Sequence, residues 1–260
     1  MTTDELYGQI LKKKTMLCVG LDTDICKFPE GVTDILDFNK AIIDATAPYC
    51  VAYKPNLAFY ECYGLEGMRA LDKTVDYIRT NYPEQFIISD AKRGDIGNTA
   101  KMYAKTFFET MDFDAVTISP YMGSETVTPF LEYKNKYAIV VALSSNKSSA
   151  DFQLAEQGGK PLYQVVMEKM MEISTPENMM FVVGATKADK LAEIRKFCPE
   201  NFFLVPGVGA QGGSAEEVIK HGANAKGGLL INSSRGVLYA SHGKDFAEAA
   251  ARVAAATAHL

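Results

Sequence analysis

The feature that most constrains the fold is an alternation of short apolar runs with longer helical patterns, repeated eight times along the chain. The short runs are rich in β-branched and aromatic residues, which is typical of strands buried on both faces. We expect these strands at residues 16–21, 50–53, 86–88, 115–118, 137–143, 180–183, 202–205 and 228–231. Eight strands that are each followed by a helix, with no linker or change of composition between them, predict a single (β/α)8 barrel domain over residues 1–260.

Helical patterns fill the intervals between these runs. Apolar residues recur in them every three or four positions, as Ile35, Phe38 and Ile42 do, and this spacing puts them on one face of a helix. We expect helices near residues 4–13, 33–47, 65–79, 98–108, 125–131, 162–173, 187–197, 215–221 and 246–259. A doubly wound open sheet is the alternative architecture, but no GxGxxG pattern follows the first strand, which weakens it. The polar segment 148–160 is long for a connection of this kind, and such loops are often functional or mobile.

The densest charge in the chain follows the third apolar run. Asp90, Lys92, Arg93 and Asp95 come within six positions of one another. Asp90 and Lys92 are two residues apart, so on extended backbone they would point to the same face. Asp95 and Thr99 are four apart and would share a helix face if the following helix started early enough. A solvated loop with local ion pairs is the alternative, but an Asp-Lys-Asp triad beside a buried strand costs desolvation free energy unless it has a function.

Polar side chains mark the carboxyl ends of the other predicted strands as well, and in (β/α)8 barrels those ends carry the active site. The glycine-rich segment 206–213 permits close approach of backbone to a ligand, and Arg235 after the eighth strand offers a fork of donors for phosphate. A tight surface turn is the alternative for the glycines, and a cap or surface ion pair for each single residue, but independent surface residues would not all fall on one rim. The candidate site residues at strand ends are Asp22, Lys54, Asp90, Lys92, Ser145, Gln211 and Arg235.

Composition excludes several classes of function. Acidic residues outnumber basic ones 32 to 27, and no basic run exceeds the three lysines at 12–14, which argues against a nucleic-acid partner. No secretory signal and no apolar run long enough to span a membrane are present. Five cysteines without a CxxC pair favour reduced thiols, and three scattered histidines show no metal-ligand spacing. We therefore expect a soluble, cytoplasmic protein without a membrane partner.

Five segments, taken in order and spacing, resemble orotidine 5′-monophosphate decarboxylases over nearly the whole chain. DxKxxD alone is shared with related sugar-phosphate barrels, whereas all five together are specific. The wording DAKRGDIGNTA is similar to the longer bacterial branch of that family. The segments are GLD at 20–22, YKPN at 53–56, DAKRGDI at 90–96, PGVGAQGG at 206–213 and NSSRG at 232–236.

The resemblance implies a cofactor-independent conversion of orotidine 5′-monophosphate to uridine 5′-monophosphate in pyrimidine biosynthesis. Lys92 would protonate ring carbon six and should stay protonated between its neighbouring carboxylates. Asp90 would lie beside the departing carboxylate, and Lys54 would bridge the carboxylates and a ribose hydroxyl. Asp95 and Thr99 would come from the partner subunit, so the active unit would be a homodimer.

The resemblance also implies how the nucleotide is held. Asp22 would bind ribose hydroxyls, Gln211 and Arg235 the phosphate, and Ser145 an edge of the pyrimidine. The register of the serine is open, because Ser144 is adjacent and a lysine stands two residues after Ser145 where the family more often has proline.

Two other functions compete with this one. A Mg²⁺-dependent sugar-phosphate enzyme, such as a hexulose-phosphate synthase or ketogulonate-phosphate decarboxylase, would need an additional carboxylate, and no Glu stands at the end of the first or second predicted strand. A non-catalytic nucleotide-binding protein is hard to reconcile with a lysine and two aspartates kept together. Decarboxylation without a metal, thiamine or pyridoxal requires the protein itself to supply electrostatic stabilisation and a proton.

Overall fold

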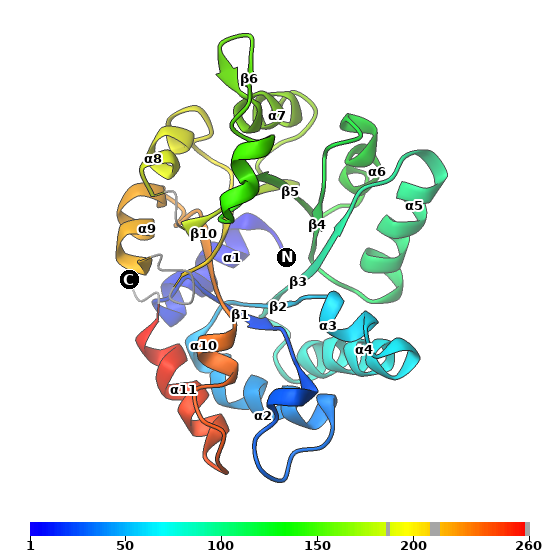
Figure 1. The fold of residues 1–260 in the computed structure, drawn as a ribbon, viewed down its shortest axis with the longest axis vertical. Helices are drawn as coiled ribbons and strands as arrows, with labels where there is room; N and C mark the ends of the chain where they lie inside the picture. The colour runs from blue at the N-terminus through cyan, green and yellow to red at the C-terminus, as the bar shows by residue number, and fades with distance from the viewer. Residues whose placement is uncertain (186–187, 209–213, 258–260) are drawn as a thin grey trace.

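The strands form a closed barrel in the computed structural model, which describes residues 1–185, 188–208 and 214–257. All eight barrel strands run parallel, and Figure 1 shows them as a central ring with the helices outside it. Their order around the ring is β1-β10-β9-β8-β5-β4-β3-β2. The predicted (β/α)8 barrel is therefore confirmed. The strands are β1 (Leu17–Leu21), β2 (Ala52–Pro55), β3 (Phe86–Arg93), β4 (Ala115–Ile118), β5 (Tyr137–Leu143), β8 (Met179–Val183), β9 (Phe203–Pro206) and β10 (Leu229–Ser233).

Helices surround the ring because each has one apolar face that must be buried against the sheet. Short 3₁₀ turns stand at Ile25–Lys27, Ala47–Tyr49, Ser124–Thr126 and Lys147–Asp151. The α-helices are α1 (Thr3–Lys13), α2 (Ile35–Thr46), α3 (Ala58–Glu61), α4 (Gly64–Asn81), α5 (Gly97–Lys105), α6 (Thr128–Leu131), α7 (Leu162–Met171), α8 (Ala188–Phe197), α9 (Ala215–Gly222), α10 (Arg235–Leu238) and α11 (Phe246–Ala256).

Helix α1 closes the amino-terminal end of the barrel and lies behind the ring in Figure 1. Its Leu6 and Ile10 are fully buried. Lys13, at its last turn, donates hydrogen bonds to the carbonyl oxygens of Ala47 and Cys50, at 2.9 and 3.0 Å, just before β2. The barrel interior is filled with apolar side chains, so this end is sealed and the opposite, carboxyl-terminal end holds the open mouth.

The third strand differs most from its prediction. It runs on to Arg93, and its pairing with β4 shifts register between Ser89 and Arg93. Within this bulge Lys92 has a left-handed backbone, with φ of 45°. The expectation that Asp90 and Lys92 share a face of extended backbone is therefore wrong, although a different geometry brings their side chains together.

Other boundaries also moved. Helix α5 begins at Gly97, so Asp95 precedes the helix, and the early start that would have put it on one helix face with Thr99 does not occur. The helical pattern beyond α5 continues as a π-helical turn, Thr106–Thr110. The segment predicted as a long polar loop folds locally, with a 3₁₀ turn and a two-stranded antiparallel hairpin of β6 (Glu156–Gln157) and β7 (Lys160–Pro161).

Candidate active site

A pocket of about 310 Å³ lies at the carboxyl-terminal mouth of the barrel. Most of the predicted strand-end residues line it, although they come from five different strands or the loops that follow them. Its apolar wall is formed by Val141 and Val182. The residues around the pocket are Asp22, Lys54, Asn56, Asp90, Lys92, Val141, Ser144, Ser145, Val182, Pro206, Gly207, Val208, Asn232, Ser234 and Arg235.

Four of these residues form a chain of alternating charges. The Nζ atom of Lys54 lies 2.6 Å from Oδ2 of Asp90 and 3.9 Å from Oδ1 of Asp22. The Nζ atom of Lys92 lies 2.5 Å from the other carboxylate oxygen of Asp90. The Lys54 side chain is only 4% exposed, whereas that of Lys92 is 54% exposed. Lys92 is therefore the end of the chain that a ligand in the pocket can reach.

The charges hold one another in the ionised state. Burial alone would raise the pKa of Asp90, but the ammonium groups of Lys54 and Lys92 outweigh it and leave that pKa well below its usual range. Burial likewise acts to lower the pKa of Lys54, and the carboxylates of Asp90 and Asp22 reverse this and raise it. The buried pair is therefore a carboxylate and an ammonium across the ordinary pH range.

Asp22 is held at the end of β1 by contacts of its backbone. Tyr239 donates a hydrogen bond from its hydroxyl to the carbonyl oxygen of Asp22, at 3.1 Å, and accepts one from the backbone N–H of Asp24, at 2.8 Å. Burial raises the pKa of Tyr239 to about 12, so the phenol keeps its proton. Oδ1 of Asp22 is buried and, among the described residues, forms no hydrogen bond. A buried carboxylate oxygen in this state is ready to accept a donor from a ligand.

Close packing at two glycines brings strand ends together. A Cβ atom on Gly20 would lie 1.9 Å from Oγ of Ser234, so only glycine lets β1 approach the loop after β10. A Cβ atom on Gly184 would lie 2.7 Å from the backbone of Ser145. These contacts explain why GLD ends the first strand and how the serine segment reaches the pocket.

The first of the two candidate serines, Ser144, is hydrogen-bonded within its own loop. Ser144 accepts a hydrogen bond at its Oγ from Gln153, at 2.9 Å, and donates its N–H to the same side chain, at 2.7 Å. Its hydroxyl also lies 2.6 Å from Oδ1 of Asn146. The side chain of Ser144 is therefore held by residues of its own loop. Both Ser144 and Ser145 line the pocket.

The predicted phosphate side of the pocket is described in part. Arg235 is exposed at the start of α10 and lines the pocket together with Gly207, whose φ of 99° is open to glycine but strained for other residues. Gln211, predicted to bind phosphate, lies outside the described residues.

Asp95 and Thr99 do not line the pocket of their own chain. Oδ1 of Asp95 accepts the N–H of Ile96, at 2.9 Å, and Thr99 is exposed on α5. Several large hydrophobic side chains close to them in the chain, or in the loop that follows β4, are exposed. These are Ile96, Met102, Tyr121 and Met122.

Several pocket residues were not among the predicted ones. Asn56 forms an isolated bridge with Asp90, and Asn232 donates a hydrogen bond to Oγ of Ser234, at 3.2 Å. Their signal in the sequence was their place in polar segments directly after apolar strands. Arg93 behaves in the opposite way, because its guanidinium turns outward to pair with Glu61 of α3 and does not reach the pocket.

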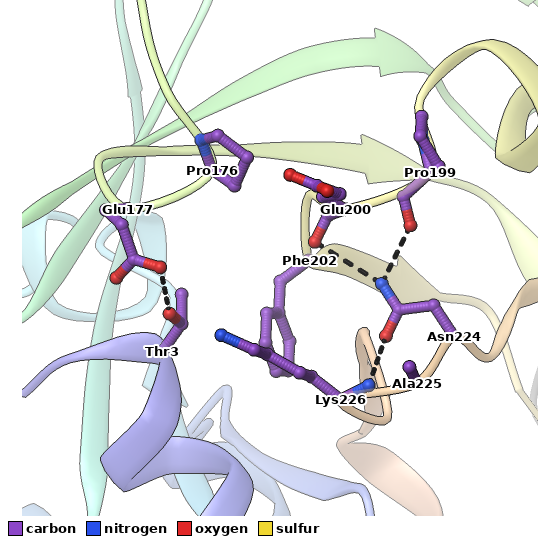
Figure 2. A pocket seen from close by; sticks show the side chains of 9 residues that line it. All are labelled: Thr3, Pro176, Glu177, Pro199, Glu200, Phe202, Asn224, Ala225 and Lys226. Carbon is purple, nitrogen blue, oxygen red and sulfur yellow. Dashed lines mark hydrogen bonds between the residues drawn. The ribbon is translucent and has the colours of Figure 1, made fainter.

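A second pocket, of about 220 Å³, lies at the opposite rim and is drawn in Figure 2. Thr3 donates a hydrogen bond to Glu177, at 2.5 Å, and Asn224 donates to the carbonyl oxygens of Pro199 and Glu200, at 2.9 and 3.3 Å. Its lining residues belong to α1 and to loops that precede strands. The bond from Thr3 ties α1 to the amino-terminal rim. The pocket lies among contacts that join α1 and the loops of this rim.

Three general expectations concern the whole chain. All five cysteines are unpaired, as predicted. Within residues 1–185, 188–208 and 214–257, no group of three or more His, Cys, Asp or Glu side chains is placed to hold a metal ion. None of the described helices is long and apolar enough to cross a membrane. The cytoplasmic location stays a prediction.

A barrel whose mouth holds alternating lysines and aspartates, beside a glycine- and arginine-lined edge, is typical of enzymes that act on small phosphorylated substrates. The model of the Orotidine 5′-phosphate decarboxylase / HUMPS family matches residues 15–252. The chain belongs to this family.

The names of similar proteins indicate which activity within this family the chain resembles most. Orotidine 5′-phosphate decarboxylase from Phocaeicola vulgatus is 57% identical over 259 residues, which cover 98% of this chain and 95% of that protein. A solved structure of a putative orotidine-monophosphate decarboxylase from Toxoplasma gondii has a TM-score of 0.82 and 35% identity, covering 97% of this chain and 98% of that one. The Leishmania donovani UMP synthase structure has the same TM-score and 37% identity, covering 96% of this chain, which spans 54% of that longer protein.

Proposed function

We propose that this chain is a single-domain orotidine 5′-monophosphate decarboxylase that forms uridine 5′-monophosphate and carbon dioxide without a cofactor. The observation that carries the proposal is the charge chain Asp22–Lys54–Asp90–Lys92 at the mouth of a barrel of this family. Loss of orotate absorbance on addition of purified protein to orotidine 5′-monophosphate is the direct test. The magnesium-dependent sugar-phosphate alternative finds no support, because the curated relatives are named as decarboxylases of this nucleotide.

The chemistry requires stabilisation of negative charge on ring carbon six, where no carbonyl group can delocalise it. Lys92, with its ammonium 2.5 Å from Asp90, is the group that stabilises this charge and then gives its proton to the carbon. Asp90 is held as a carboxylate beside the site of the departing carboxylate, and their repulsion ends when carbon dioxide leaves. The ammonium of Lys54, 2.6 Å from Oδ2, holds the Asp90 carboxylate in place.

The remaining contacts bind the nucleotide. Asp22 binds a ribose hydroxyl, and Arg235 with Gln211 binds the phosphate. Ser145, which lines the pocket as Ser144 does, is the proposed contact for the pyrimidine edge.

A homodimer would complete the site. Asp95 and Thr99 do not line their own pocket, and the exposed apolar side chains around them, Ile96 and Tyr121 among others, are the kind that a subunit interface covers. We infer that Asp95 and Thr99 contribute to the pocket of the partner subunit, related by a two-fold axis.

Activity should persist after chelation. Asp90 is already neutralised by the ammonium of Lys54, with which it pairs at 2.6 Å, and the positive charges of Lys54 and Lys92 would repel a divalent cation at this place. We expect turnover after dialysis against EDTA to match that of untreated protein, measured by orotate absorbance. Loss of turnover that added Mg²⁺ restores would instead favour the sugar-phosphate type of site.

Replacing Arg235 by alanine should mainly weaken binding of the nucleotide. If the guanidinium holds a desolvated phosphate, the loss is about 2–5 kcal/mol. Part of it should appear in kcat, because binding energy remote from the reacting carbon can be used in the transition state. Steady-state kinetics and titration with uridine 5′-monophosphate measure both. Arg252→Ala, on the exposed face of α11, is the matched control, and near-normal constants for Arg235→Ala would show that the phosphate is bound elsewhere.

A further inference from the structure

Thr117 on β4 lies in the barrel wall directly beside the charge chain. It is only 1% exposed, and its hydroxyl makes two hydrogen bonds. Oγ1 accepts the backbone N–H of Lys92, at 2.9 Å, and donates to Oδ1 of Asp90, at 3.1 Å. One side-chain atom therefore contacts both members of the pair that the proposed reaction uses.

The pairing of β3 with β4 explains why a side chain is needed here. Ser89 pairs with Val116 and Arg93 pairs with Ile118, so three residues of β3 stand opposite Thr117 alone. Regular ladder hydrogen bonds are interrupted in such a bulge. The N–H of Lys92 takes the Thr117 hydroxyl as its partner, and without it a partly buried donor would be left unsatisfied.

The bulge also carries backbone strain. Lys92 has a φ of 45°, in the left-handed region that non-glycine residues adopt only at a cost in conformational free energy. Surrounding contacts must therefore hold this conformation. The hydrogen bond from Lys92 to Thr117 is such a contact, and Thr117 is itself stiff because its β-branched side chain strongly restricts χ1.

We propose that Thr117 is a positioning residue that fixes the Lys92 backbone and the Asp90 carboxylate in their reactive arrangement. The inference rests on the proposed function of Lys92 and Asp90. Thr117 is not among the residues that line the pocket, and it acts through the two charged residues. Oδ1 of Asp90 thus receives the Lys92 ammonium and the Thr117 hydroxyl, while Oδ2 receives Lys54.

The test is Thr117→Val, which keeps the shape and removes the hydroxyl. We expect kcat to fall roughly tenfold to a hundredfold, since a misplacement of about 1 Å can have an effect of that size. The dissociation constant of uridine 5′-monophosphate should stay within about threefold of wild type, because the phosphate contacts are untouched. Thr117→Ser keeps both hydrogen bonds and should recover most of the lost kcat.

Thr46→Val is the matched control, because its buried hydroxyl on α2 bonds Ile42 of the same helix and Tyr53 of β2, and Thr46 does not line the pocket. It should lower the melting temperature without lowering kcat. A Thr117→Val enzyme with kcat within about twofold of wild type, or no recovery in Thr117→Ser, would overturn the inference. If the valine variant does not fold, Thr117→Cys, a weak hydrogen-bonding group of similar size, takes its place with the same expected loss. Lys92→Ala in parallel separates the two proposals: full turnover in that variant would reject the site itself.

Discussion

Lys92→Ala is expected to abolish decarboxylation while the protein still binds uridine 5′-monophosphate. In the proposed mechanism the substitution removes both the positive charge that faces the carbanion and the proton it receives, whereas Arg235 and Asp22, the proposed phosphate and ribose contacts, stay in place. Each lost tenfold in rate corresponds to about 1.4 kcal/mol of transition-state stabilisation, and a loss of several powers of ten is expected here. Single-turnover kinetics and product titration measure the two quantities separately.

A matched control is available on the surface. Lys190→Ala removes an exposed lysine of α8 that pairs with Glu193, and it should change neither turnover nor binding. Lys92→Ala also leaves Asp90 with one ammonium partner fewer, so its folding should be checked by thermal unfolding. Turnover within about tenfold of wild type in a folded Lys92→Ala protein would show that another group supplies the proton.

Activity should return when two inactive variants are mixed. If each site takes Lys92 from one chain and Asp95 from its partner, Lys92→Ala and Asp95→Ala homodimers are each nearly inactive. In a heterodimer one site carries both lesions and the other carries neither. With random pairing about half of the dimers are mixed and half of their sites are intact, so roughly a quarter of wild-type activity should return after co-refolding.

The control mixes Lys92→Ala with Lys54→Ala. Both side chains contact Asp90 of their own chain, so every heterodimer site keeps one lesion and no recovery is expected. Mass spectrometry of differently tagged chains should establish subunit exchange in both mixtures. If exchange occurs and the Lys92→Ala and Asp95→Ala mixture gains nothing over its parents, Asp95 serves its own chain.

The barrel and most of its mouth could be predicted from sequence for a simple physical reason. Buried parallel strands are apolar on both faces, so each run stops abruptly where the strand reaches the polar rim, as at Asp22 and Arg235. Counting these stops gave eight strands and the residues at their ends. Lys54 was expected just after its strand and lies within β2, a shift that leaves its side chain in the pocket.

The local geometry of the site could not be predicted in the same way. The N–H of Lys92, whose backbone is left-handed, bonds Thr117, which is 25 residues away and belongs to the neighbouring strand. Alternation of side chains assumes extended backbone, and a bulge breaks that assumption without any mark in the sequence of β3 itself. The sequence leaves open whether Asp95 joins the following helix, because short polar segments with glycines do not fix where a helix begins.

The closed amino-terminal end of the barrel determines the route by which the substrate enters and carbon dioxide leaves. Helix α1 and the filled interior close the amino-terminal end, so the mouth above Lys92 serves as entrance and exit alike. In the proposed reaction, carbon dioxide is released beside Asp90, at the mouth of the barrel. Carbon dioxide is linear and apolar, so few groups there can bind it. It can diffuse outward past the apolar side chains of Val141 and Val182. Because carbon dioxide and the product nucleotide leave through the same mouth, the fold itself constrains the order in which they leave.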